Sequence, residues 1–285
     1  MSQSKISDLM KKYNIPSRCR SETQTSKTMI PMTERMYEIL RGAILGDGSL
    51  KIEKNGINAC FSYTSKSYQH IYYVVKDFLE YKTGIGIRHN DVYDKRTNKM
   101  YYKYQFTTVV SPTFTEEYYK WYINKVKHIP SNLILTPLIC KIWYLGDGCL
   151  RNGKNNVQDI VLCTNCFEKD EIEEILLPQL KQFNPKLYYM ASLKNGKDSY
   201  AIEIGKKLKI ADFLDYIGDC PFDDYKYKWD IKPKLLSGTW SKYNKFANEW
   251  IRLYKDGENI ETVAIKYGVP VKAVANTLIN HWIIK

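Results

Sequence analysis

The sequence predicts an α+β protein made of two pseudo-symmetric copies of one unit, each ordered helix–strand–strand–helix–strand–strand–helix. A nine-residue segment that ends in Gly-Asp-Gly occurs at 40–48 and again at 140–148, so that 100 residues separate Asp47 from Asp147. The register continues beyond these segments, because Thr64 and Thr164 each lie 17 positions after their aspartate. Similarity at one fixed spacing indicates a duplicated structural unit.

The other elements follow from the periodicity of apolar residues, which is two in strands and between three and four in helices. After the first Gly-Asp-Gly segment, we expect a strand at 57–63, a helix at 68–81, strands at 85–93 and 100–110, and a helix at 113–124. After the second, we expect a strand at 157–163, a helix at 168–183, strands at 186–193 and 199–204, and a helix at 207–217. Four-stranded antiparallel sheets, each with one solvated face, are the expected result.

The composition favours a polyanionic partner. The 43 Lys and Arg residues exceed the 31 Asp and Glu residues, which gives a net charge of +12. Nucleic acid is the commonest polyanion, although a basic chain can also be merely soluble. No run of 18 apolar residues and no secretory signal are present, so neither a membrane span nor secretion is expected.

Cysteine usage indicates a reducing compartment. The seven cysteines are scattered and odd in number, which favours free thiols over disulfides. We expect an intracellular protein, either of a bacterial or phage-infected cytoplasm or of an organelle. Cys163 and Cys166 have Cys-x-x-Cys spacing, but no second pair lies nearby, so buried thiols are expected rather than a metal site.

Basic residues recur within the predicted strands and their loops. The candidates for one solvated, basic sheet face are Lys51, Lys54, Arg88, Lys103, Arg151, Lys154 and Lys194. A four-stranded sheet with such a face is suited to hold DNA. An ordinary solvent-exposed face is the alternative interpretation, and the Gly-Asp-Gly segments decide against it.

The two ends of the chain differ from the repeats. We divide the chain into an N-terminal arm (1–32), a first repeat (33–133), a second repeat (134–236) and a C-terminal region (237–285). The C-terminal region has the helix and glycine-turn pattern of a helix-turn-helix. Its recognition helix would be 271–280, with Lys272, Asn276 and Asn280 facing outward. A helical cap that does not bind DNA is the alternative.

The two aspartates carry the chemistry. Two helices packed through their apolar faces would bring Asp47 and Asp147 together at their ends. Two carboxylates at one point repel each other unless a cation lies between them. Hard divalent cations such as Mg²⁺ prefer oxygen ligands, and metal ions held in this way are a common means of cutting phosphodiesters.

The two segments and the pattern between them resemble the LAGLIDADG homing endonucleases, in their single-chain form with two motifs. The stretch 61–66 and the amphipathic helix after it resemble the family's second strand and following helix, and 135–148 resembles its second motif. The resemblance covers about 34–232. Ile142 departs from it, because a glycine there usually lets the two helices approach closely, and Arg41 and Lys141 occupy a normally small position.

The resemblance implies that the antiparallel sheets of the two repeats form a DNA-binding saddle and that the chain acts as a monomer. The implied activity is a Mg²⁺-dependent double-strand break in a long asymmetric DNA target, which promotes the mobility of an intron or intein. Mn²⁺ is the alternative cofactor, and Ca²⁺ is expected to support binding without cleavage. The implied metal-binding groups are the carboxylates of Asp47 and Asp147 and the nearby backbone carbonyls of Gly46 and Gly146.

The resemblance also implies further catalytic residues. Ser65 and Asn165 fall where the family has polar residues that order water. Each active site of the family has a basic residue near the end of its repeat, and the spacing makes Lys127 and Lys228 the candidates. The neighbouring alternatives are Lys125 and Lys226. Generic DNA-contacting or surface lysines are the competing interpretation.

Three functions remain possible on this scaffold. A site-specific DNA endonuclease is favoured because both acidic positions are retained. A catalytically silent intron RNA maturase or a DNA-binding regulator would not need two intact acidic motifs. A dual endonuclease–maturase would use the same basic surface for RNA, so intron RNA is a further candidate partner.

Overall fold

The computed structural model describes residues 3–15, 30–54, 56–95, 97–153, 158–192, 198–231, 238–281 and 283–284. The chain divides into two compact units. One is Met1–Asp147 with Cys166–Glu171, and the other is Gly148–Asn165 with Ile172–Lys285. Lys154 and Lys194, two of the predicted DNA contacts, lie outside the described residues.

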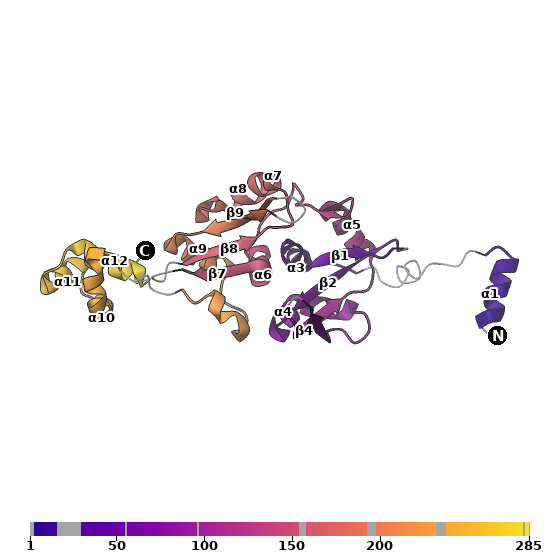
Figure 1. Ribbon diagram of the computed structural model, residues 1–285, viewed down its shortest axis with the longest axis horizontal. Coiled ribbons are helices and arrows are strands. Elements are labelled where there is room, and N and C mark those ends of the chain that lie inside the picture. The colour runs from indigo at the N-terminus through magenta and orange to yellow at the C-terminus, as the bar shows by residue number, and fades with distance from the viewer. Residues whose placement is uncertain are drawn as a thin grey trace. The chain divides into compact units, whose positions relative to one another are not determined.

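The first unit contains a four-stranded antiparallel sheet with the order β1-β2-β4-β3 (Figure 1). Its strands are β1 (Ser49–Ile52), β2 (Ala59–Ser65), β3 (Arg88–Asp94) and β4 (Lys99–Thr107). Its helices are α1 (Gln3–Lys12), α3 (Glu34–Leu45), α4 (Tyr68–Val75), the 3-10 helix η1 (Lys76–Tyr81), α5 (Pro112–Trp121), α6 (Pro137–Asp147) and the short α7 (Lys169–Glu171). A small hairpin, β5 (Tyr122–Ile123) with β6 (Val126–Lys127), follows α5.

The two faces of this sheet differ in polarity, as predicted. Residues opposite each other in an antiparallel pair share a face. The pairs Leu50–Phe61 and Tyr63–Phe106 therefore lie on one face, and all four side chains are buried. The core of the unit forms on this face, where α4 and α5 contact β2.

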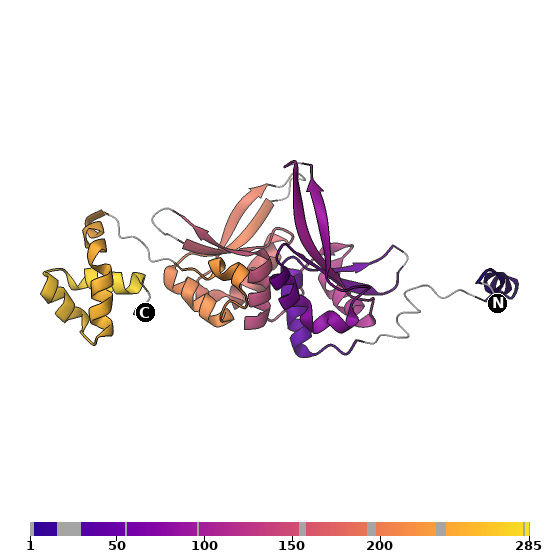
Figure 2. The ribbon, with the colours of Figure 1, turned by 90° about the horizontal axis from the view of Figure 1, so that it is seen from below.

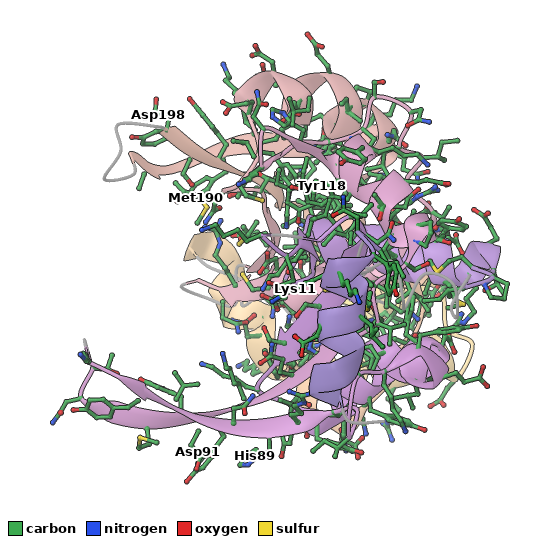
Figure 3. The ribbon with its side chains drawn as sticks, turned by 90° about the vertical axis from the view of Figure 1, so that its right-hand side faces the viewer. Lys11, His89, Asp91, Tyr118, Met190 and Asp198 are labelled. Carbon is green, nitrogen blue, oxygen red and sulfur yellow. The ribbon has the colours of Figure 1, made fainter. Side chains whose placement is uncertain are left out.

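The hairpin of β3 and β4 is long, because seven consecutive residue pairs join Arg88–Asp94 to Lys99–Gln105. In Figure 2 it extends away from the rest of its unit, and Figure 3 shows His89 and Asp91 along it. Tyr93 near its far end and Tyr102 at its middle are exposed. A two-stranded projection with large exposed side chains offers contact surface without adding to the core.

The second unit repeats this sheet with the order β7-β8-β10-β9. Its strands are β7 (Gly148–Asn152), β8 (Gln158–Cys163), β9 (Lys186–Ser192) and β10 (Asp198–Ile204). The helical elements are the π-helical turn η3 (Ile172–Leu176), α8 (Leu177–Gln179), the 3-10 helices η4 (Lys181–Phe183) and η5 (Asp223–Lys228), and α9 (Lys207–Ile217). The predicted order of elements is confirmed, and α9 has the predicted bounds.

Two predicted helices differ from the observed ones. The helix expected at 168–183 is broken into α7, a π-helical turn, α8 and a 3-10 turn. Pro178 lies in the first turn of α8, and its missing N–H cannot donate to the carbonyl four residues earlier, which disrupts a regular helix. The helix expected at 113–124 ends at Trp121, because Tyr122 adopts an extended conformation (φ −133°, ψ 120°) and begins β5.

The C-terminal region forms its own hydrophobic core. It consists of the 3-10 helix η6 (Gly238–Phe246), α10 (Ala247–Lys255), α11 (Ile260–Tyr267) and α12 (Val271–Asn280). Trp250, Val263, Val274 and Leu278 are buried together. Gly268 ends α11 with a left-handed φ of 60°, which glycine adopts without strain. The predicted helix at 271–280 is confirmed. Among the residues described here, no helix has the length and apolarity needed to cross a bilayer.

Arg41, which departs from the family pattern, belongs to an ion network on the outer side of α3. Its guanidinium lies 3.4 Å from Glu117 Oε1 and stacks 5.3 Å from the ring centre of Tyr37. Lys120 Nζ lies 2.8 Å from the same carboxylate oxygen. Glu117 is 1% exposed, so both cations are needed to offset its desolvation.

We expect the Glu117→Gln variant to lose stability at neutral pH but not at low pH. Burial acts to raise the pKa of Glu117, but the hydrogen bonds from Lys120 and Arg41 outweigh it and the pKa is lowered. A carboxyl with a lowered folded pKa contributes stability that is lost as the pH falls through that pKa. Urea unfolding should show a deficit of about 1–3 kcal/mol at pH 7 that shrinks below about pH 4. The exposed neighbour Glu116→Gln is the control, and a deficit independent of pH would contradict this account.

Candidate active site

The predicted packing of the two motif helices is observed. Most of the buried residues of α3 and α6 are apolar, and the two helices are in extensive contact within the first unit. They approach closely at Gly42, where an added Cβ would lie 2.7 Å from the carbonyl oxygen of Ile139 and 2.8 Å from Cβ of Ile142. The isoleucine that departs from the family pattern is therefore accommodated by a glycine on the opposite helix.

The Gly-Asp-Gly ends of the helices meet each other reciprocally. A Cβ at Gly46 would lie 3.4 Å from the backbone nitrogen of Asp147, and a Cβ at Gly146 would lie 3.4 Å from that of Asp47. The carboxylate oxygen Oδ2 of Asp47 lies 3.6 Å from the same point at Gly146. Asp47 is exposed and Asp147 is half-buried. The structure thus places the two acidic residues at one accessible position.

The groups at this position fit a hard cation. The two carboxylates supply negative oxygen ligands, and the carbonyls of Gly46 and Gly146 are oxygen donors in the same segments. Among the described residues, no group of three or more His, Cys, Asp and Glu side chains is positioned to hold a metal. A cation here would therefore have two acidic side-chain ligands, with the rest of its shell from backbone, water or a bound phosphate.

Lys127 is directed at the first motif by the β5–β6 hairpin. Tyr122 pairs with Lys127, and the two-residue loop between the strands has positive φ at both positions. This is the type I′ geometry that suits a tight hairpin. Lys127 Nζ donates to the carbonyls of Ile44 at 2.8 Å and Gly48 at 3.3 Å.

The environment of Lys127 alters its proton affinity. Burial lowers the pKa of its ammonium group, while Cys166, Asp147 and Asp47 act in the opposite direction. The Lys127 side chain is half-buried and lies close enough to both aspartates for their negative charges to act against this lowering of its pKa. The carbonyls of the first motif hold it in place.

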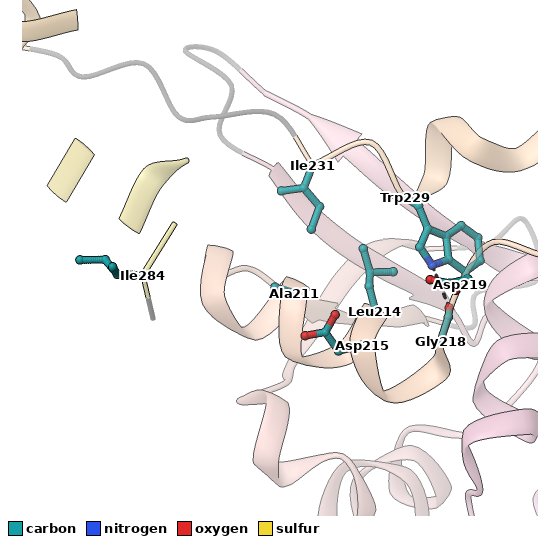
Figure 4. A pocket seen from close by; sticks show the side chains of 8 residues that line it. All are labelled: Ala211, Leu214, Asp215, Gly218, Asp219, Trp229, Ile231 and Ile284. Atoms are coloured by element: carbon teal, nitrogen blue, oxygen red, sulfur yellow. Dashed lines mark hydrogen bonds between the residues drawn. The ribbon is translucent and has the colours of Figure 1, made fainter. Parts of the chain in front are cut away.

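Lys228 has the corresponding place beside the second motif. Its Nζ donates to the carbonyl of Gly148 at 2.7 Å, its side chain is 5% exposed, and it lies over the ring of Tyr225 at 4.7 Å. The adjacent Trp229 fixes this segment, because its indole N–H donates to the carbonyl of Gly218 at the end of α9 at 3.1 Å (Figure 4).

The alternative lysines lie elsewhere. Lys125 is exposed in the turn between β5 and β6. Lys226 forms an exposed ion pair with Asp223 at 2.7 Å, and this partner raises the pKa of Lys226. In each pair, only the predicted first choice contacts the carbonyl of the second glycine of its motif. The geometry favours Lys127 and Lys228 over their neighbours.

The two predicted water-ordering residues have different environments. Ser65 is buried, and its Oγ accepts from the backbone N–H of Ser67 at 3.1 Å and lies 3.0 Å from His70 Nδ1. Asn165 is exposed in a turn. His70 and its second partner, Tyr63, were not among the predicted site residues. The available signal was a histidine on the apolar face of the predicted helix at 68–81, where a buried polar group requires partners.

The open face of the first sheet carries three of the predicted DNA contacts. The register places Lys51 opposite Cys60, and it places Arg88 opposite Gln105. Lys103 lies two residues from Gln105 along β4 and therefore points to the same face, away from the core. Lys54 is exposed in the loop after β1. These residues match the predicted basic face.

The corresponding face of the second sheet differs from the prediction. Arg151 pairs with Asp159 at 2.5 Å and with Glu203 at 2.6 Å, and it stacks on Tyr188 at 4.8 Å. Both carboxylates lie on the same face as Arg151, since Asp159 is directly opposite it and Glu203 is opposite Val161. The charge of Arg151 is therefore offset locally, and this part of the face is not basic. On α12, Lys272 is exposed, while Asn276 and Asn280 are half-buried rather than fully outward.

The prediction of buried thiols at the Cys-x-x-Cys segment is wrong for one residue. Cys163 is half-buried at the end of β8, whereas Cys166 is exposed. The prediction failed because β8 ends at Cys163 and the chain turns outward after it.

Comparison with known proteins agrees with the geometry. A model of the LAGLIDADG DNA endonuclease family matches residues 37–209. The cytochrome b mRNA maturase bI2 of Debaryomyces hansenii is 26% identical over 163 residues, which cover 55% of this chain and 60% of the maturase. The DNA endonuclease I-ChuI of Chlamydomonas applanata is 28% identical over 151 residues, covering 48% of this chain and 68% of that protein.

A solved structure shares the fold. The homing endonuclease I-WcaI bound to its DNA recognition sequence aligns with a TM-score of 0.62, covering 76% of this chain and 96% of that chain, at 22% identity. The two curated relatives have different described roles, one in RNA maturation and one in DNA cleavage.

Proposed function

Because the chain belongs to the LAGLIDADG DNA endonuclease family, we propose that it is a site-specific homing endonuclease that makes a double-strand break in a long asymmetric DNA target. One observation carries this proposal: Asp47 and Asp147 lie at the reciprocal contact of the two motif ends. Two like charges in proximity oppose folding, so a carboxylate pair of this kind favours a site that binds a cation. The break would promote the mobility of the intron or intein that encodes the chain.

The proposed cofactor is Mg²⁺ or Mn²⁺, held by Asp47 and Asp147 with the carbonyls of Gly46 and Gly146 nearby. When bound, such an ion supplies water activation and stabilises charge on the leaving oxygen. The chain's own contribution is positional. Lys127 and Lys228 hold positive charge beside the two motifs, where it stabilises the developing charge on phosphate.

The proposed DNA contacts are unequal in the two halves. Lys51, Arg88 and Lys103 on the first sheet provide charge for phosphates and donors for base edges. Arg151 is already paired with two carboxylates, so its position is fixed and its positive charge is more than offset. Different faces in the two halves favour an asymmetric target. The C-terminal helices α11 and α12 would act as a helix-turn-helix on flanking DNA, with Lys272 on the exposed side. We further propose that the chain acts as an intracellular monomer.

Cleavage-site selection tests this function. The purified chain is incubated with a library of duplexes that includes intron-insertion sites, in Mg²⁺ and separately in Ca²⁺, and the DNA ends are sequenced. We expect one long asymmetric site cut with short 3′ overhangs in Mg²⁺ alone, and binding without cutting in Ca²⁺. Binding in both metals without cut ends would reject the nuclease.

An intron RNA maturase is the second candidate, because the maturase of Debaryomyces hansenii is a relative. The exposed basic surface of the first sheet would serve RNA as well as DNA. Splicing of the host intron transcript with and without the purified chain separates the two functions. Both activities in one chain would identify a dual endonuclease–maturase.

We expect Lys127→Met and Lys228→Met each to slow cleavage about a hundredfold, because each removes a fixed positive charge beside a motif. Lys125→Met and Lys226→Met are matched controls two residues away and should retain nearly full activity. The measurement is single-turnover cleavage with enzyme in excess, accompanied by a binding titration in Ca²⁺. An equal loss of rate in the control variants would show that Lys127 and Lys228 contribute only general positive charge, as any surface lysine near the DNA would.

A further inference from the structure

A buried polar network in the first repeat leads to the edge of the aspartate pair. Tyr63 Oη lies 3.0 Å from His70 Nε2, and His70 Nδ1 lies 3.0 Å from Ser65 Oγ. All three side chains are buried, and His70 is 0% exposed. Each ring nitrogen of a neutral histidine has one role, donor or acceptor, so both of its partners are fixed by one tautomer.

The network is built on local backbone structure. Ser67 caps the N-terminus of α4 by accepting the backbone N–H of His70, and its own N–H donates to Ser65 Oγ. Residues of β2 and the first turn of α4 are thereby joined through one histidine ring. Such a network is costly to bury unless every member is satisfied, so its position in the core invites a functional explanation.

Tyr63 connects this network to the motif ends. A Cβ at Gly146 would lie 3.4 Å from Tyr63 Oη and 3.6 Å from Asp47 Oδ2. The phenol oxygen and the carboxylate therefore flank the same glycine. Because Gly146 has no side chain, Tyr63 Oη and Asp47 Oδ2 both have room beside it.

The second repeat does not reproduce this arrangement. At the matching positions, 100 residues later, stand Cys163, Asn165 and Asp170. Cys163 is half-buried, and Asn165 and Asp170 are exposed. Thr164, which is buried there, donates to the carbonyl of Tyr200 at 2.7 Å instead. The Tyr63–His70–Ser65 network is therefore present in the first repeat and has no counterpart at the matching positions of the second.

We propose that Tyr63 is a positioning residue for the aspartate pair, with its phenol O–H oriented toward the Gly146–Asp47 contact by His70 and Ser65. In this arrangement the Ser65 hydroxyl donates to Nδ1 of His70, and the Nε2–H of His70 donates to Tyr63 Oη. The phenol proton is then directed away from the imidazole, toward the oxygen atoms around Asp47. The opposite tautomer would direct the phenol proton to the imidazole and turn its lone pairs toward a carboxylate, which is unfavourable.

The consequence is an asymmetric active site. Groups that orient a metal-binding carboxylate typically change metal affinity or activity by about 10- to 100-fold when they are removed. Loss of the Tyr63 hydroxyl should therefore slow cleavage of one DNA strand more than the other and cause nicked DNA to accumulate. DNA affinity should be unchanged, because Tyr63 is buried and cannot contact DNA.

Imidazole nitrogen NMR tests the geometry without reference to activity. The chain has four histidines, so the His70 ring signals can be assigned from a His70→Gln variant. We expect His70 to be the Nε2–H tautomer, with Tyr63→Phe shifting the Nε2 resonance and Ser65→Ala shifting the Nδ1 resonance. A predominant Nδ1–H tautomer would overturn the proposal.

Metal binding and cleavage test the role. We expect Tyr63→Phe to weaken Mn²⁺ binding about tenfold, as measured from the electron paramagnetic resonance signal of free Mn²⁺. In single-turnover cleavage, the same variant should cut one DNA strand more slowly than the other. Tyr104→Phe, on β4 of the same sheet, is the control and should match the wild type. A Tyr63→Phe protein with a lower melting temperature but wild-type Mn²⁺ affinity and strand rates would reduce the network to a structural role and overturn the proposal.

The inference rests on the proposed function, yet the two fail differently. If the wild-type chain binds Mn²⁺ but does not cut DNA, the proposed nuclease function is rejected. In that case the positioning role of Tyr63 is still supported if Tyr63→Phe weakens Mn²⁺ binding. If the wild-type chain cuts DNA and the Tyr63→Phe variant has the same Mn²⁺ affinity and the same cleavage rate for each strand, the positioning role is rejected. The nuclease function is then retained.

Discussion

Asparagine in place of either Asp47 or Asp147 should abolish double-strand cleavage while leaving DNA affinity close to that of the wild type. The neutral amide has nearly the same shape as the carboxylate but supplies no negative charge to hold a divalent cation. Because the two motif ends contact each other, each aspartate belongs to the same small cluster of charge, and loss of one weakens the position for both strands. The basic face of the first sheet is untouched by either change.

The measurement is cleavage of a supercoiled plasmid carrying the selected target, which separates intact, nicked and linear DNA. Linear product should be absent for both variants, with binding in Ca²⁺ retained. Mg²⁺ should raise the melting temperature of the wild type and not of the variants, since a ligand stabilises only the state that binds it. Asp256→Asn, in an exposed C-terminal turn, serves as the control. Linear product from either active-site variant would reject the assignment.

Valine in place of Gly42 should prevent the first unit from folding stably. A Cβ alone would lie 2.7 Å from a backbone oxygen of α6 and 2.8 Å from Cβ of Ile142, closer than side-chain carbons are found. Backbone cannot move aside without separating the helices. Overpacking of this kind costs about 1–3 kcal/mol for small additions, which is the range expected for Gly42→Ala, and more for a branched side chain.

Urea unfolding of a graded series measures this effect. Gly42→Ala should lower the unfolding free energy of the first unit, and Gly42→Val should remove the cooperative transition of that unit. Gly205→Ala is the control, because an added Cβ there would meet only the side chain of Glu203, at 3.3 Å. The double variant Gly42→Ala with Ile142→Gly should be less destabilised than the sum of the two single changes, since one of the two collisions is removed. Strict additivity would show that Gly42 and Ile142 do not meet.

The internal repeat of the sequence made much of the fold predictable. The 100-residue spacing of the Gly-Asp-Gly segments and the alternation within strands led to the correct order of elements, and the bounds of α9 and α12 agree with the prediction. Local chemistry decided where the prediction failed. Pro178 interrupts one predicted helix, and the extended conformation of Tyr122, which begins β5, ends another helix early.

The candidate site was partly predictable for a different reason. Spacing from the aspartates predicted Lys127 and Lys228, and in the structure each of them contacts the carbonyl of the second glycine of its motif. Spacing says nothing about what lies across a sheet or beneath a helix. The carboxylates beside Arg151 come from β8 and β10, and the Tyr63–His70 contact links β2 to α4. Both depend on tertiary packing that periodicity does not specify.

The contact of Gly42 with Ile142 makes the two repeats unequal partners at the helix crossing. Two copies of the first repeat, paired symmetrically, would set glycine against glycine, which lets two helices approach closely. Two copies of the second would set isoleucine against isoleucine where even one Cβ too many collides. The second half is thus the shape complement of the first rather than of itself. A copy of the second half could not replace the first half at this crossing without separating the two helices.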